Sequence, residues 1–247
     1  IFLIIKEKKL FIDNYSKIGL SGCVGGVGIA TAAIGFILSL THTTAANTLL
    51  MLAAMPFITA ILAYIFLKEK VSNTTWIAII IAAVGIIFMA YNNTDFSDLF
   101  GIACGLLSSL GFAIFSVSLK WKKETPKFTT VALGGLFCFL FSLLALFFLD
   151  NNFVMNIKNS SLSALHGFLV CMGFILFTIG SKRLPAADLT LLSLTEVLGG
   201  VFWVWLPILG IQEVPSPSTI IGGFIIILSI FYYSFFTQRK RHFSGLS

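Results

Sequence analysis

Residues 45–91 read AANTLLMLAAMPFITAILAYIFLKEKVSNTTWIAIIIAAVGIIFMAY. Two apolar runs, 46–67 and 75–91, are separated here by a short polar segment that carries Lys68, Glu69 and Lys70. A membrane-spanning helix needs about 20 apolar residues, and shorter runs of about 17 still suffice. This stretch therefore predicts two consecutive membrane helices joined by a short loop.

The same pattern extends over the whole chain of 247 residues. Hydrophobic residues make up 57% and charged residues only 11% of it, with a mean hydropathy of +1.00. Soluble domains carry roughly 25% charged residues. A transmembrane β-barrel would alternate apolar and polar residues over about ten positions, and no such alternation occurs. The expected fold class is all-α, a polytopic membrane helix bundle.

Eight complete spans are predicted, each an apolar run between polar breaks. They are 18–40, 46–67, 75–91, 99–120, 128–149, 162–181, 187–208 and 217–236. The chain begins with an apolar run, 1–5, that is followed by lysines. This order indicates the end of a further span rather than a signal peptide, in which the charges precede the apolar run.

Basic residues concentrate in alternate connections between the spans. Of the 16 lysines and arginines, all but Lys158 fall on one side. The positive-inside rule makes that side, and the C-terminus, cytoplasmic in a multi-pass protein of the cell (inner or plasma) membrane. The net charge of +6 is then explained by topology and by contact with anionic lipid headgroups, so nucleic acid is not an expected partner.

Two parts of the chain resemble each other. Residues 44–52 resemble residues 185–193 at an offset of 141, and residues 66–72 resemble residues 210–216 at an offset of 144. The first pair opens a span in each half, whereas the second pair lies on opposite sides of the membrane. The two halves are therefore expected to be inverted, which is a construction typical of secondary transporters.

The repeat divides the chain into two units. Residues 1–97 form an incomplete first repeat of three spans and a stub, and residues 98–247 form a second repeat of five spans with a cytoplasmic tail. Restoring the symmetry requires about 45 residues before Ile1, at about 20 residues per span. About ten helices are expected in the intact protein.

The motifs that follow one another along both halves resemble the EamA family of the drug/metabolite transporter superfamily, with an N-terminal truncation. They are Pro56 inside a span, LKEKVS at 67–72, Trp76, Gly85, AAD at 186–188, LLSLTEV at 191–197, VWL at 204–206 and QEVPS at 212–216. The family often has proline where Val197 stands. The resemblance implies ten helices in two inverted repeats, a central cavity with alternating access, and export or exchange of small organic metabolites such as amino acids.

Glu196 is the main candidate for a functional residue. It stands about ten residues into the span 187–208, which places it about 15 Å deep at about 1.5 Å per residue, near the bilayer midplane. An acidic residue there costs about 2.5–3.5 kcal/mol and faces the bundle or a water-filled cavity. It either exchanges a proton or balances a substrate ammonium group, or it is a protonated structural residue.

Four further residues are candidates for binding substrate or protons. Ser193 and Trp203 stand three residues before and seven residues after Glu196, so on one helix they share its face; Thr195 is adjacent. Their structural alternatives are interhelical hydrogen bonds for the hydroxyls and interface anchoring for the tryptophan. Pro56 interrupts the second span at the place symmetric with Val197, where a broken helix either exposes backbone carbonyls or aids packing.

Other features point to structural roles. The GxxxG pairs Gly22/Gly26 and Gly101/Gly105 are expected to pack helices within one chain, with a homodimer as the alternative. Asn47, at the start of its span, is interpreted as a helix N-cap. The four cysteines all fall inside spans without CxxC spacing, which indicates apolar fillers rather than a disulfide or metal site.

Two other classes of function compete with transport. An integral membrane enzyme would need a clustered ligand set or a nucleophile with its base, such as HExxH or GxSxG, and the sequence contains neither. A lipid-handling or structural membrane protein is the second alternative. We therefore expect a transporter rather than an enzyme, without a cofactor or metal, whose partners are a small-molecule substrate and membrane lipid.

Overall fold

The computed structural model describes residues 17–69, 72–91, 96–122, 125–148, 156–182, 186, 189–190, 193–205 and 216–244. All regular secondary structure in these ranges is helical, as expected. The elements are α3 (Gly19–His42), α4 (Ala45–Leu52), α5 (Met55–Leu62), the π-helix η1 (Ala63–Leu67), α6 (Asn73–Tyr91), α7 (Phe96–Trp121), α8 (Lys127–Phe148), α9 (Ile157–Gly180), α11 (Leu194–Trp205) and α12 (Pro217–Ser244).

Six helical stretches of the described chain are long and apolar enough to cross a membrane. They are Gly19–His42, Ala45–Leu67, Phe96–Trp121, Lys127–Phe147, Ile157–Gly180 and Pro217–Phe236. α6 contributes a shorter apolar helix, Asn73–Phe88. α11 has only 12 residues and covers the later part of the expected span 187–208. The protein is a multi-pass membrane protein, and within the described ranges the expectation of eight full-length spans is met by six.

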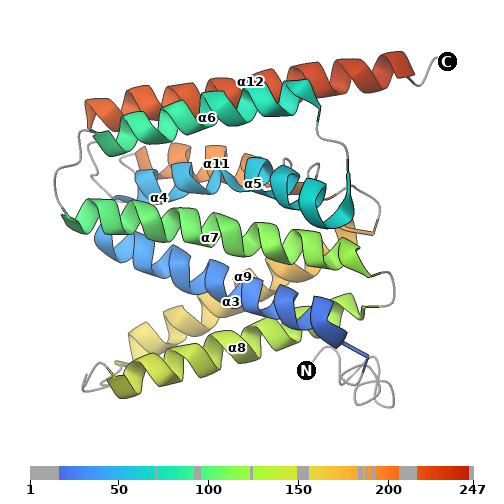
Figure 1. Ribbon diagram of the computed structural model, residues 1–247. Coiled ribbons are helices and arrows are strands. Elements are labelled where there is room, and N and C mark those ends of the chain that lie inside the picture. Colours follow the sequence, from blue (N-terminus) through green and yellow to red (C-terminus); the bar gives the residue numbers. More distant parts are fainter. Residues whose placement is uncertain are drawn as a thin grey trace.

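The bundle is arranged around α7, which crosses its middle (Figure 1). α3 packs along α7 over most of its length, and α4 and α5 contact α7 as well. α6 and α12 lie side by side as a separate pair, whereas α8 packs on α3, with α9 beside α8 (Figure 1). α11 contacts α4. The α4–α5 segment thus lies between α7 and α11.

Small residues permit the closest helix contacts. A Cβ atom added at Gly28 of α3 would lie 2.6 Å from the carbonyl oxygen of Gly111 on α7, a distance that real Cβ atoms do not show. In the predicted GxxxG pair of α7, Gly101 packs against Thr43 and Gly105 packs against Met51. Close approach of backbones through small residues is characteristic of membrane helices. The expectation that these glycines pack helices within one chain is confirmed.

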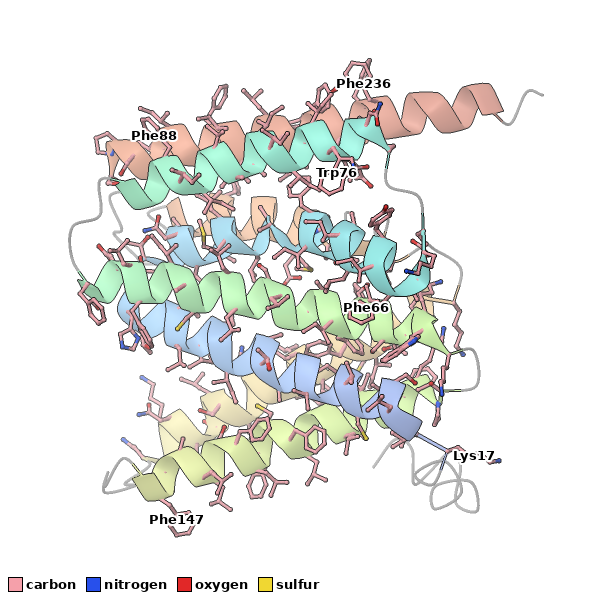
Figure 2. The ribbon with its side chains drawn as sticks, viewed as in Figure 1. Lys17, Phe66, Trp76, Phe88, Phe147 and Phe236 are labelled. Atoms are coloured by element: carbon pink, nitrogen blue, oxygen red, sulfur yellow. The ribbon has the colours of Figure 1, made fainter. Side chains whose placement is uncertain are left out.

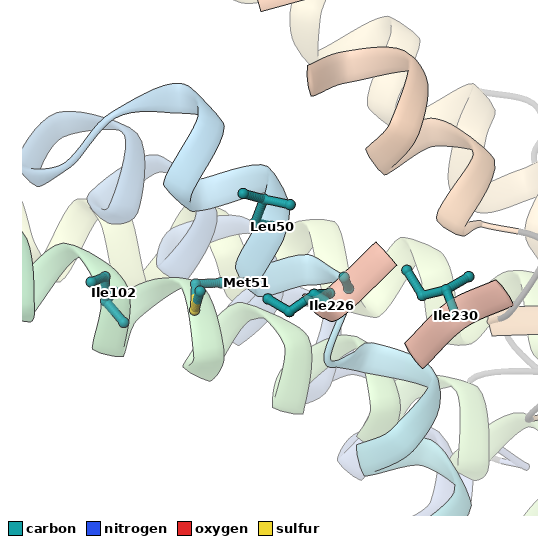
Figure 3. Close-up of a cluster of buried hydrophobic side chains, with 6 residues drawn as sticks. Leu50, Met51, Ile102, Ile226 and Ile230 are labelled. Atoms are coloured by element: carbon teal, nitrogen blue, oxygen red, sulfur yellow. The ribbon is translucent and has the colours of Figure 1, made fainter. Parts of the chain in front are cut away.

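Apolar side chains fill the contacts between α4, α7 and α12. Leu50, Met51, Ala53, Ile102, Ile226 and Ile230 form a buried cluster there, shown in Figure 3. Large apolar side chains also cover the outer surface, and Figure 2 shows Phe88, Phe147 and Phe236 at its periphery. Such a surface is expected of helices that face lipid, which agrees with the membrane assignment.

Candidate functional site

The second span is broken near its middle. α4 ends at Leu52, Ala53 and Ala54 form a turn, and α5 starts at Met55 with Pro56 in its first turn. Proline has no N–H group, so the carbonyl four residues earlier, that of Leu52, loses its ordinary helical partner. The predicted interruption at Pro56 is confirmed, and the span consists of α4, α5 and η1 rather than one continuous helix.

Ser109 of α7 stabilises this break. Its hydroxyl donates to the carbonyl oxygen of Met51 at 2.8 Å, and the N–H group of Ala54 donates to the same oxygen at 3.1 Å. Both Ser109 and Met51 are fully buried. Two roles were expected for the break, the exposure of backbone carbonyls or an aid to packing. The carbonyl of Met51 serves packing, because it already accepts a hydrogen bond from Ser109 of α7.

Glu196 lies in the first turn of α11, not ten residues inside a continuous helix. Ser193 stands in a turn just before α11; its carbonyl accepts from the Glu196 N–H at 3.0 Å, and its hydroxyl donates to the Thr190 carbonyl at 2.7 Å. The expectation of an uninterrupted helix through Ser193 was therefore wrong. A carboxylate in the first turn is favoured by the positive end of the helix dipole.

The start of α11 contacts the break in the second span. The Ser193 hydroxyl lies 3.6 Å from the sulfur of Met55, the residue next to Pro56. Further along α11, Gly200 packs against Leu49 of α4. The sequence offset of 141 residues pairs Met55 with Glu196. Met55 and Glu196, which the expected repeat would pair, both lie in the first turn of a helix, and the contact of Ser193 with Met55 makes these two helix starts neighbours.

The predicted site residues are only partly brought together. Glu196 is exposed, and Trp203, seven residues further on, is 54% exposed, whereas Val204 is buried. Glu196 and Trp203 therefore share a side of α11 that borders the face packed on α4, about 10 Å apart along the axis. Ser193 belongs to the preceding turn. Thr195 lies in α11, and its side chain is outside the described residues.

Ser109 and Ser116 were not among the residues that the sequence predicted to be functional, although they stand seven residues apart on α7 and so share one face. Ser116 is buried, and in the described part of the chain its hydroxyl has no hydrogen-bond partner. Buried polar atoms are ordinarily paired. The sequence signal was weak because serine is common at helix contacts in membranes.

Asn47 was wrongly interpreted as an N-cap. The cap of α4 is Thr44, whose hydroxyl accepts from the N–H group of Asn47 at 3.1 Å. Asn47 is buried one turn further on, and its side-chain carbonyl accepts from the Thr219 hydroxyl of α12 at 2.9 Å. The amide therefore joins α4 to α12 instead of capping its own helix.

Comparisons with known proteins agree with this architecture. The model of the EamA-like transporter family matches residues 1–91. The resemblance expected from the sequence is thus confirmed for residues 1–91. One relative, the uncharacterized transporter YwfM of Bacillus subtilis strain 168, is 25% identical over 206 residues, which are 80% of this chain and 67% of YwfM.

A solved crystal structure shares the fold of this chain. The matched part covers 91% of this chain and 82% of the chain in the solved structure, with a TM-score of 0.57 and 15% sequence identity. At that identity the likeness concerns the fold alone. The family that residues 1–91 match and the relative YwfM are both described as transporters.

Proposed function

We propose that the protein transports small organic metabolites such as amino acids across the cell membrane, as an exporter or exchanger that works by alternating access, with its C-terminus in the cytoplasm. The match of residues 1–91 to the EamA-like transporter family and the similarity to YwfM support the general class. The observation that carries the proposal further is the contact between two helix starts, Met55 of α5 and the Ser193–Glu196 segment before and within α11. Broken helices near the midplane form the substrate sites of many secondary transporters.

Glu196 is the chemical centre of the proposed site. Within the described residues its carboxylate forms no ion pair, and it lies beside the turn that contacts the break in the second span. A lone carboxylate at this place can accept a proton or balance the ammonium group of an amino acid, and alternation between these two partners would couple substrate movement to proton movement. Trp203 would add an aromatic wall on the same side of α11.

The test is uptake by the protein reconstituted in proteoliposomes, with a panel of amino acids and related metabolites, each measured with and without a pH gradient. Glu196→Gln keeps the shape of the side chain and removes its charge. We expect this variant to fold normally and to lose about tenfold or more in transport rate, or to lose the response to the gradient. Glu69→Gln is the matched control, because Glu69 is exposed at the end of η1.

The two variants distinguish the proposed role from a general effect of charge. Transport that is lost in Glu196→Gln and kept in Glu69→Gln supports the proposal. Unchanged uptake and an unchanged pH profile in Glu196→Gln would refute the role of this carboxylate, and the absence of transport for every compound in the panel would refute the substrate class.

A further inference from the structure

Three lysines gather at one corner of the bundle. Lys120 lies in the last turn of α7, Lys127 is the first residue of α8, and Lys182 follows the end of α9. The ammonium group of Lys182 lies 5.2 Å from the ring centroid of Phe128, the residue after Lys127. The ends of three helices that are separate in the sequence therefore bring these cations to the start of α8.

Among the described residues, the charges that act on Lys127 are positive. Lys127 is half-buried, and the positive charges of Lys120 and Lys182 both act on it. A helix dipole favours cations at its C-terminal end, which suits Lys120, whereas Lys127 stands at the positive end of α8. Among the described residues no acidic side chain forms an ion pair with any of the three.

The positive-inside rule explains why lysines lie at this end of the helices, but it does not require them to converge on the N-terminal end of one helix. Repulsion between like charges opposes that arrangement unless an anion offsets it. Ammonium groups and the N-terminal end of a helix both attract phosphate. The corner also lies beside the apolar ring of Phe128 and at the ends of helices long enough to cross a membrane, where lipid headgroups are expected.

We propose that Lys120, Lys127 and Lys182 bind the phosphate group of an anionic phospholipid. The proposed lipid site does not include Glu196, and lipid binding there does not depend on the proposed transport activity. The bound lipid would tie the ends of α7, α8 and α9 together, where among the described residues Lys120 and Lys182 act on Lys127 by repulsion.

The experiment is native mass spectrometry of the purified protein, titrated separately with phosphatidylglycerol and with phosphatidylcholine. We expect the wild-type chain to bind phosphatidylglycerol more tightly. Each basic residue near a membrane surface contributes about a fivefold change in affinity for anionic lipid, so Lys127→Gln should weaken this binding about fivefold and replacement of all three lysines by glutamine about a hundredfold. Binding of phosphatidylcholine should not change in either variant.

Two controls and a competitor make the result decisive. Lys158→Gln removes a lysine from the start of α9, away from this corner, and should leave the affinity for phosphatidylglycerol unchanged. Glu124→Gln tests whether the carboxyl group of Glu124, in the connection between α7 and α8, offsets the lysines, in which case this variant binds phosphatidylglycerol more tightly than wild type. Equal binding of phosphatidylglycerol by wild type and the triple variant would overturn the proposal. Displacement of the lipid by millimolar inorganic phosphate would overturn it in favour of a soluble phosphate ligand.

Discussion

Gly28 of α3 meets the backbone of α7 at Gly111, and Gly28→Ala tests how far the fold depends on that contact. The added methyl group would lie 2.6 Å from the Gly111 carbonyl oxygen and 2.9 Å from the backbone nitrogen of Phe115. Ordinary contact begins at 3.4 Å, so the two backbones must separate by about 0.8 Å. Neither obstacle is a side chain that can rotate away.

Three terms determine how much Gly28→Ala should change the free energy of unfolding. Overpacking of a tight contact costs about 1–3 kcal/mol. A separation of about 0.8 Å also lengthens the 2.8 Å bond from the Ser108 hydroxyl to the Ala32 carbonyl beyond hydrogen-bonding distance, at a cost of about 0.6 kcal/mol. Alanine offsets about 1 kcal/mol of this through its higher helix propensity. We expect Gly28→Ala to destabilise the protein by about 2 kcal/mol.

The assay is reversible unfolding in mixed micelles of a mild detergent and dodecyl sulfate, followed by tryptophan fluorescence. The control is Gly135→Ala in α8, where an added Cβ atom would meet nothing within 4 Å. This variant should be neutral or more stable by up to about 1 kcal/mol. Equal free energies of unfolding for Gly28→Ala and Gly135→Ala would refute the conclusion that backbone contact between α3 and α7 limits stability.

Two hydrogen bonds between helices give further predictions with matched controls. Ser109→Ala removes the bond to the Met51 carbonyl at the break and should lower the free energy of unfolding by about 1 kcal/mol, whereas Ser118→Ala, whose hydroxyl bonds its own helix, should change it by less than about half as much. Thr219→Val leaves the buried Asn47 carbonyl without its partner and should also cost about 1 kcal/mol in the same unfolding assay. A cost for Ser118→Ala as large as that for Ser109→Ala would contradict the first prediction, and wild-type stability of Thr219→Val would contradict the second.

Helix positions were largely predictable because hydropathy is a local property. The expected span 18–40 appears as Gly19–His42, and 99–120 appears within Phe96–Trp121. Pro56 was also correctly read as an interruption, since the missing N–H group of proline acts on its own helix. The start of α11 at Leu194 was not predictable in this way, because no proline or glycine stands at that point to mark it.

The candidate site was predicted less completely than the helices. Glu196 could be singled out because a carboxylate in an apolar run is rare. Its place in the first turn of α11, and the contact of Ser193 with Met55, required the tertiary structure. Asn47 shows the same limit: an N-cap and a buried interhelical amide have the same local sequence, and only the position of Thr219 distinguishes them.

The sequence by itself therefore determined that this is a helical membrane protein, where most of its helices lie, and which acidic residue stands apart from its surroundings. These properties follow from the transfer of each segment from water to hydrocarbon, which depends on the segment alone. Only the tertiary structure decided which carbonyl Ser109 occupies, which glycines meet, and which lysines converge on α8. Those contacts join residues far apart in the chain, and in lipid they are selected by close packing and hydrogen bonding rather than by hydrophobicity.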